Sequence, residues 1–99
     1  AHAAFEILEA GGNAIDAAVT AAAVLSVTEP MMTGIGGDMF ALIWIAKEKK
    51  LVALNASGRA GSLMTRDELI KRGRTRNIPR GVETITVPGA LAGWQTLLT

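Results

Sequence analysis

Apolar positions in the first third of the chain recur with the spacing of helices. Residues 3–10 place three large apolar side chains on one side, and Gly11-Gly12 follows where a helix is expected to stop. Asn13 then stands where a side chain can cap the next helix, and Asp16 lies where negative charge meets its positive end. Alanines occupy nearly every face of residues 14–27. The pattern predicts two helices, of which the second is buried and closely approached on more than one side.

The pattern changes after Pro30, which prevents the second helix from continuing. Residues 38–45 contain an almost unbroken apolar run, as expected of a strand that is covered on both faces. A polar turn at 47–50 separates this run from a second short apolar segment at 51–54. The sequence therefore predicts a β-hairpin over residues 38–54.

Three glycines occupy four positions in the loop between the second helix and the first strand, at Gly34, Gly36 and Gly37. A phosphate-binding glycine loop runs from a strand into a helix, whereas this loop runs from a helix into a strand. Close packing of the buried helix on a sheet is therefore the favoured interpretation. A backbone nest for a phosphate or an oxyanion is the alternative.

The second half of the chain alternates between polar loops and short periodic segments. Thr65 and Glu68 have the spacing of a capping box, and Pro88-Gly89 suits the first turn of a helix. Five segments are predicted: a flexible loop at 57–61, a helix at 66–72, a basic surface loop at 71–80, a strand at 84–87 and a helix at 90–98.

The composition is unusually apolar for a short chain. Hydrophobic residues make up 49% of the 99 residues and charged residues 19%, against a usual charged share of about 25%. A small self-contained domain needs more polar surface, because its surface is large relative to its volume. The chain also opens and closes in helical pattern without an initiator Met. We expect residues 1–99 to form a single partial domain of a longer protein.

Charge and residue types exclude several classes of function. A net charge of +1 gives no electrostatic reason for binding nucleic acid or a membrane. Cysteine is absent and there is one His, so the sequence predicts no disulfide framework, no metal centre and no cofactor. The longest apolar stretch is too short and too polar for a spanning helix. Periplasmic, secreted and cytoplasmic locations all stay open.

Arg59 is the candidate functional residue that the pattern singles out. It stands between Gly58 and Ala60-Gly61, just after a predicted strand, with no local hydrophobic reason to be there. A guanidinium on such a loop can hold a carboxylate through two parallel hydrogen bonds. An exposed, solvated Arg is the alternative.

Other polar residues have simpler interpretations. His2 has no Ser or Cys partner at a recognisable spacing, so a surface or packed role is favoured. Asp38 could be catalytic, yet its place at the start of a strand favours a capping or turn role. Thr33 and Ser57 are loop hydroxyls to which no base can be assigned. Composition and spacing therefore indicate a buried α/β segment in which Arg59 is the one residue that stands out.

Four motifs resemble those of the γ-glutamyltranspeptidase family, in the family's order and with sensible spacing over essentially the whole chain. They are Ala10-Gly11-Gly12-Asn13-Ala14-Ile15-Asp16-Ala17-Ala18-Val19, Glu29-Pro30 with Thr33-Gly34-Ile35-Gly36-Gly37-Asp38-Met39-Phe40, Ser57-Gly58-Arg59-Ala60, and Val87-Pro88-Gly89-Ala90 with Gly93-Trp94. Each motif alone would be weak, whereas four in register make a strong resemblance.

The resemblance implies an α+β chain that forms part of a four-layer αββα sandwich, the N-terminal-nucleophile hydrolase fold. Such proteins are made as precursors that cut themselves into a large and a small subunit. The new N-terminal Thr of the small subunit is the nucleophile, and its own amine is the base. This chain resembles the N-terminal part of the large subunit. We therefore expect the nucleophile to lie downstream, the small subunit to be the partner, and the fragment alone to be inactive.

The family's substrate-binding Arg, which pairs with the α-carboxylate of a γ-glutamyl group, corresponds to Arg59. The resemblance therefore implies cleavage of the γ-glutamyl amide of glutathione or a related compound. Two departures bear on the substrate: Ala60-Gly61 follows Arg59 where the family often has Ala-Pro, and Gly36-Gly37-Asp38 interrupts a commoner run of glycines. The Ser-Gly-Arg form resembles divergent members that act on other amides. Oxamate-type amides, acylated β-lactam side chains and a non-catalytic ligand-binding homologue are the alternatives.

Overall fold

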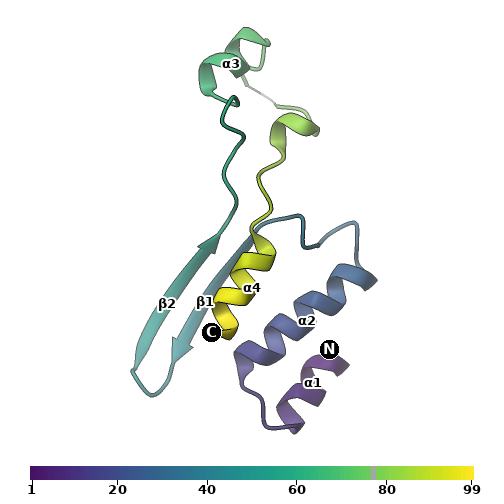
Figure 1. Ribbon diagram of the computed structural model, residues 1–99, viewed down its shortest axis with the longest axis vertical. Coiled ribbons are helices and arrows are strands. Elements are labelled where there is room, and N and C mark those ends of the chain that lie inside the picture. The colour runs from purple at the N-terminus through teal and green to yellow at the C-terminus, as the bar shows by residue number, and fades with distance from the viewer. Residues whose placement is uncertain (77) are drawn as a thin grey trace.

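The computed structural model describes residues 1–76 and 78–99. It is an α+β chain in which helices lie beside a two-stranded hairpin, while one short helix stands apart at the far end (Figure 1). The elements are α1 (His2–Glu9), α2 (Ala14–Thr28), β1 (Met39–Ile45), β2 (Lys50–Ala56), α3 (Arg66–Lys71), a 3₁₀ helix (Val82–Thr84) and α4 (Ala90–Leu98).

The connection between α1 and α2 follows the sequence signals closely. Gly11 has φ of +90°, a conformation that a glycine adopts without strain at a helix end. Asn13 Oδ1 accepts hydrogen bonds from the backbone N–H groups of Ile15 and Asp16, at 2.7 and 3.0 Å. Asp16 Oδ2 in turn accepts from the Asn13 N–H at 3.0 Å. This reciprocal capping box confirms the predicted start of the second helix.

The hairpin pairs β1 with β2 antiparallel, with Met39 opposite Ala56 and Ile45 opposite Lys50. Its two faces are not equally covered. Phe40 and Trp44 keep 68% and 61% of their surface exposed, while the alternate positions of β1 are partly buried. The expectation of a strand covered on both faces is therefore wrong for the described residues, because α4 is the only described helix that contacts this hairpin, and Gly93 of α4 lies against Met39 and Ala56.

Three glycines allow α4 and the segment before it to approach the hairpin closely. A Cβ on Gly93 would come within 2.7 Å of the Ala56 Cβ and 2.9 Å of the Met39 Cε. A Cβ on Gly89 would overlap the Ala56 carbonyl, and one on Gly58 would overlap the Val87 carbonyl. These positions must stay without side chains for the two backbones to come together.

The glycine loop at 34–37 does not have the role that the sequence favoured. Of the described residues, none lies within 4 Å of a Cβ built on Gly34 or Gly36, so no close packing requires a glycine there. Within the described chain, α2 packs on α1 and α4, and a groove of about 700 Å³ lies between its first turns and β1. The expected contact of a buried α2 with the sheet is therefore corrected.

Burial along α2 is also lower than the sequence predicted. Ala17 and Val19 are buried, whereas Val24, Leu25 and Val27 are exposed. The helix is approached on two sides, by α1 and by α4, as expected. Because these neighbours leave one side uncovered, the apolar composition exceeds what the described residues bury.

The strand predicted at 84–87 is absent from the described residues. A 3₁₀ helix ends at Thr84, and the extended backbone after it forms one hydrogen bond to the loop that follows β2, from the Val87 N–H to the Arg59 carbonyl at 2.8 Å. Pro88 has no N–H with which to continue a ladder. The extended backbone after Thr84 was predicted correctly, but no described strand pairs with it.

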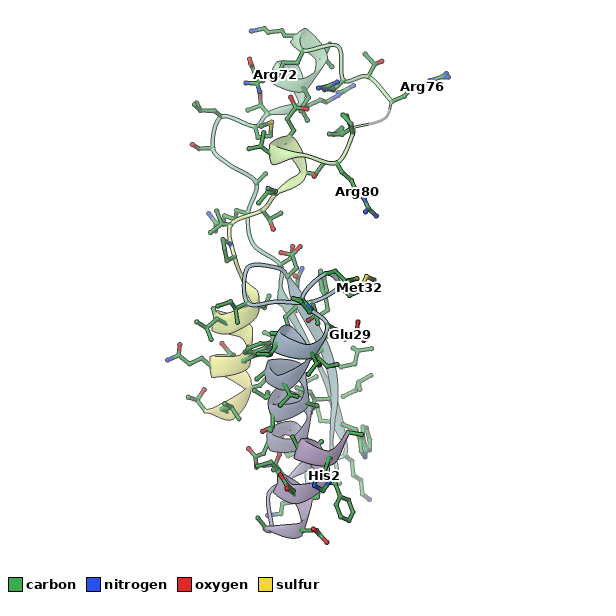
Figure 2. The ribbon with its side chains drawn as sticks, turned by 90° about the vertical axis from the view of Figure 1, so that its right-hand side faces the viewer. His2, Glu29, Met32, Arg72, Arg76 and Arg80 are labelled. Carbon is green, nitrogen blue, oxygen red and sulfur yellow. The ribbon has the colours of Figure 1, made fainter. Side chains whose placement is uncertain are left out.

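The part of the chain that contains α3 and the 3₁₀ helix, called here the outlying part, is held together by ion pairs. Thr65 Oγ1 accepts from the Glu68 N–H at 3.3 Å and caps α3, whereas the Glu68 carboxylate pairs with Arg72 at 2.9 Å instead of closing the capping box. Glu83 pairs with Arg74 at 2.9 Å. Arg72, Arg76 and Arg80 all lie in this part, with Arg76 and Arg80 pointing outward (Figure 2). The basic segment is thus tied to the 3₁₀ turn as well as solvated.

We predict that Gly58→Ala in the full-length protein lowers the free energy of unfolding by about 1–3 kcal/mol or more, since the new Cβ would overlap the Val87 carbonyl. Urea unfolding measures the loss. Gly61→Ala is the matched control, because a Cβ there meets nothing within 4 Å, and we expect a change below about 0.5 kcal/mol. Equal effects of the two substitutions would contradict the close approach at Gly58.

Candidate functional site

Arg59 lies on the loop that follows β2, three residues after the strand ends. The turn begins where Asn55 Oδ1 accepts a hydrogen bond from the Ser57 N–H at 3.0 Å. Arg59 is exposed, and within the described part of the chain its guanidinium forms no hydrogen bond or ion pair. Its backbone carbonyl is held by Val87 N–H. The loop is therefore anchored while the charged group stays available.

Asp38 connects the start of β1 to two segments that are distant in sequence. Its Oδ1 accepts hydrogen bonds from Thr86 Oγ1 at 2.8 Å and from the Gly58 N–H at 3.1 Å. The Thr86 hydroxyl first, and then the Gly58 N–H, hold the pKa of Asp38 below its ordinary value of 3.8, because both donors favour the charged carboxylate. The predicted local capping or turn role is corrected: the partners of Asp38 are tertiary.

The neighbouring carbonyl ties the same place to α4. The Gly37 carbonyl accepts from the backbone N–H groups of Gly89 and Ala90, at 3.1 and 3.0 Å, which are donors at the start of that helix. Gly37 and Asp38 together therefore join the glycine loop, the loop that carries Arg59 and the first turn of α4. We call this meeting point the Asp38 junction, comprising Gly37, Asp38, Gly58, Thr86 and Gly89.

A cavity of about 470 Å³ lies along the glycine loop and ends at Asp38. It is lined by Pro30, Met32, Thr33, the three loop glycines and Asp38. Met32 and Glu29 lie at the end of α2 that faces the outlying part of the chain (Figure 2). Arg59 does not line this cavity. It belongs instead to the adjacent loop, one residue beyond Gly58.

The other candidate residues have structural explanations. His2 lies 3.3 Å from Glu6 on the exposed face of α1, far from the junction, in line with a surface role (Figure 2). Asp16 belongs to the capping box of α2. Among the residues that the structure describes, no group of three His, Cys, Asp or Glu side chains could hold a metal ion. No described helix combines the length and hydropathy needed to cross a bilayer.

The whole chain, residues 1–99, matches the family model described as gamma-glutamyltranspeptidase. The chain belongs to the γ-glutamyltranspeptidase family. This agrees with the four motifs, and the junction assembles residues from three of them. The family fold is the N-terminal-nucleophile hydrolase fold, and the mixed α+β structure of this chain forms part of it.

Curated relatives in the γ-glutamyltranspeptidase family are considerably longer than this chain. It is 44% identical over 93 residues to the glutathione hydrolase-like YwrD proenzyme of Bacillus subtilis, covering 93% of this chain and 17% of that protein. It is 45% identical over 93 residues to the oxamate amidohydrolase proenzyme of Klebsiella pneumoniae, with 92% and 17% covered. The chain therefore spans about a sixth of these relatives, both of which are named as proenzymes.

Solved γ-glutamyltranspeptidases have the same arrangement of elements. The enzyme from Helicobacter pylori superposes with a TM-score of 0.82 at 32% identity, covering 98% of this chain and 28% of that one. The enzyme from Pseudomonas nitroreducens, complexed with L-DON, gives 0.83 at 31% identity, with 98% and 29% covered. Because both matches extend over nearly the whole chain, the predicted fold class is confirmed.

Thr86 and Gly37 are members of the junction that the sequence did not indicate. A Thr in an extended segment carries no pattern that names Asp38, 48 residues away, as its partner, and the Gly37 carbonyl carries none that names the N–H groups of Gly89 and Ala90. The separation of Asp38 from Gly58 is 20 residues. Only the fold of the chain brings these groups together.

The lowered pKa of Asp38 predicts a pH-dependent contribution to stability. Because the folded pKa lies below the ordinary value of 3.8, the charged carboxylate stabilises the fold fully above that value, and the contribution is lost as the pH falls through the folded pKa. We expect Asp38→Asn to lower the Tm of the full-length protein at neutral pH. Thermal melts over a pH series should show the difference shrinking at acid pH. A difference independent of pH would contradict the prediction.

Proposed function

We propose that the full-length protein is an amide hydrolase or acyltransferase that cleaves the γ-glutamyl bond of glutathione or a related compound. Membership of the γ-glutamyltranspeptidase family over residues 1–99 carries the proposal. The names glutathione hydrolase-like and glutathione hydrolase among the curated relatives support it. In this proposal the chain is part of the large subunit and contributes substrate binding rather than the nucleophile.

Arg59 is the proposed substrate-binding residue. Its guanidinium is exposed on an anchored loop and is not used by another side chain in the described structure. A guanidinium fits a carboxylate through two parallel hydrogen bonds, and the α-carboxylate of a glutamyl group is such a partner. The geometry thus leaves Arg59 ready to bind an anion without first breaking an internal ion pair.

The reaction itself is proposed to use an N-terminal Thr released by self-cleavage downstream of this chain. The hydroxyl of that Thr would attack the amide carbonyl, its own amine would take the hydroxyl proton and pass it to the departing amine, and the C–N bond would break to leave an acyl-enzyme ester. The acyl group then passes to water or to an acceptor amine. The proenzyme names of the relatives support a processed precursor, and the partner proposed for this chain is the small subunit from the same precursor.

A second substrate class is supported by the relatives. The oxamate amidohydrolase of Klebsiella and the acylase ACY 1 of a Pseudomonas strain are 45% and 43% identical to this chain. Oxamate also carries a carboxylate that a guanidinium can bind, although it is bonded directly to the amide carbon, whereas the α-carboxylate of a γ-glutamyl group lies several bonds from its amide. A panel of γ-glutamyl, oxamate and acylated β-lactam amides separates these classes.

Arg59→Ala tests the proposed binding role in the full-length protein. We expect kcat/KM for γ-glutamyl p-nitroanilide to fall by about 30-fold or more, because the substrate carboxylate would lose its charged partner. Arg80→Ala is the matched control, since Arg80 is exposed and points away from the chain (Figure 2). An unchanged kcat/KM in the Arg59 variant would remove this residue from the site.

Self-processing is tested by intact-mass measurement of the purified full-length protein, with N-terminal sequencing of any second species. We expect two fragments, of which the smaller begins with Thr, because the proposed nucleophile becomes a free amine-bearing residue only after cleavage. A single uncut chain under native conditions would contradict the hydrolase proposal and favour a ligand-binding homologue.

A further inference from the structure

The Asp38 junction and the adjoining residue Val87 hold the loop that carries Arg59 at two points. The Gly58 N–H, immediately before Arg59, is held by Asp38 Oδ1 at 3.1 Å. The Arg59 carbonyl is held by the Val87 N–H at 2.8 Å, and Val87 follows Thr86, whose hydroxyl is bound to the same Asp38 oxygen. One carboxylate oxygen therefore ties the backbone before Arg59 to the segment that holds the backbone after it.

We propose that Asp38 is a positioning residue for Arg59, and that its carboxylate fixes the loop from which the guanidinium reaches the carboxylate of the substrate. The inference rests on the function proposed above. Asp38 does not touch the substrate in this proposal. It acts through the backbone at Gly58 and through Thr86.

The absence of a direct contact between the two charged groups supports this role. In the described structure no ion pair joins Asp38 to Arg59, although their backbones are linked through Gly58. A direct pair would compete with the substrate carboxylate for the guanidinium donors. Fixing the backbone instead positions Arg59 and leaves its charge for the ligand.

The loop needs such an anchor because of its own sequence. Gly58 and Gly61 flank Arg59 and allow the unanchored backbone many conformations. Ordering these residues on binding would cost conformational entropy, which weakens ligand affinity. An anchor formed before the substrate arrives removes part of that cost. Loss of Asp38 should therefore appear in KM more than in kcat.

The contacts that dock α4 are separate from the Asp38 carboxylate. Gly89 and Ala90 donate to the Gly37 carbonyl, and Gly93 packs against Met39 and Ala56. These backbone and apolar contacts remain when the carboxylate is removed. We therefore expect Asp38 variants to fold, with the loop rather than the helix released.

The test compares γ-glutamyl p-nitroanilide with its α-carboxamide analogue in the full-length enzyme. Asp38→Ala should raise KM for the carboxylate substrate by about tenfold and leave the carboxamide nearly unchanged, because only the former uses Arg59. Asp38→Asn keeps an acceptor oxygen and should recover most of the loss. Asp67→Ala, which removes an exposed carboxylate of α3, is the matched control and should leave both substrates unchanged.

Thr86→Val is a second variant that keeps side-chain shape while removing the hydroxyl donor, and it should reproduce part of the Asp38→Ala effect. The preference for the carboxylate substrate over its carboxamide analogue is the quantity compared among the variants. Adding Asp38→Ala to Arg59→Ala should cause no further loss of this preference. Equal losses on both substrates would overturn the inference in favour of a purely structural Asp38. If Arg59→Ala abolishes the preference while both Asp38→Ala and Thr86→Val retain it, the inference alone fails. If Arg59→Ala also retains the preference, the proposed role of Arg59 fails and the inference with it.

Discussion

The close approach of two backbones, at the end of β2 and before α4, is the constraint on which the rest of the structure depends. Gly58, Gly89 and Gly93 carry no side chain where a Cβ would meet Val87, Ala56 or Met39. This contact brings the helix onto the hairpin and places residues 86–90 beside the strand ends. Because the two backbones meet where a Cβ would overlap the facing chain, we expect these glycine positions to tolerate substitution poorly.

The candidate site is a consequence of that approach. Once the segments before α4 lie against the hairpin, the Asp38 carboxylate meets Thr86 and Gly58, and the Arg59 carbonyl meets Val87. The polar contacts thus select one arrangement of a loop that its glycines would otherwise leave free. The exposed guanidinium of Arg59 is held out from the chain by an arrangement made mostly by backbone groups.

Many of the large apolar side chains of this chain are exposed in the described structure. Phe40, Leu42 and Trp44 line an exposed face of the hairpin, and Val27 is exposed on α2. The chain spans about a sixth of the curated relatives it matches. Unbroken apolar runs are typical of covered elements, so the sequence pattern predicted more burial of these segments than the described residues provide. The described residues cover one side of each.

The sequence by itself determined the helices and the hairpin, because capping groups, glycine stops and apolar runs act over a few residues. Asn13 and Asp16 cap α2, and Gly11 ends α1, as local chemistry requires. The sequence also singled out Arg59, whose flanking glycines mark an unusual loop.

The sequence could not identify Thr86 as a partner of Asp38, nor distinguish the open Gly34 from the tightly packed Gly58. It wrongly gave residues 84–87 a strand, since a ladder needs a neighbour that only the tertiary fold can supply. Contacts across 20 to 48 residues were decided by how the chain closes on itself, and no local pattern encodes that closure.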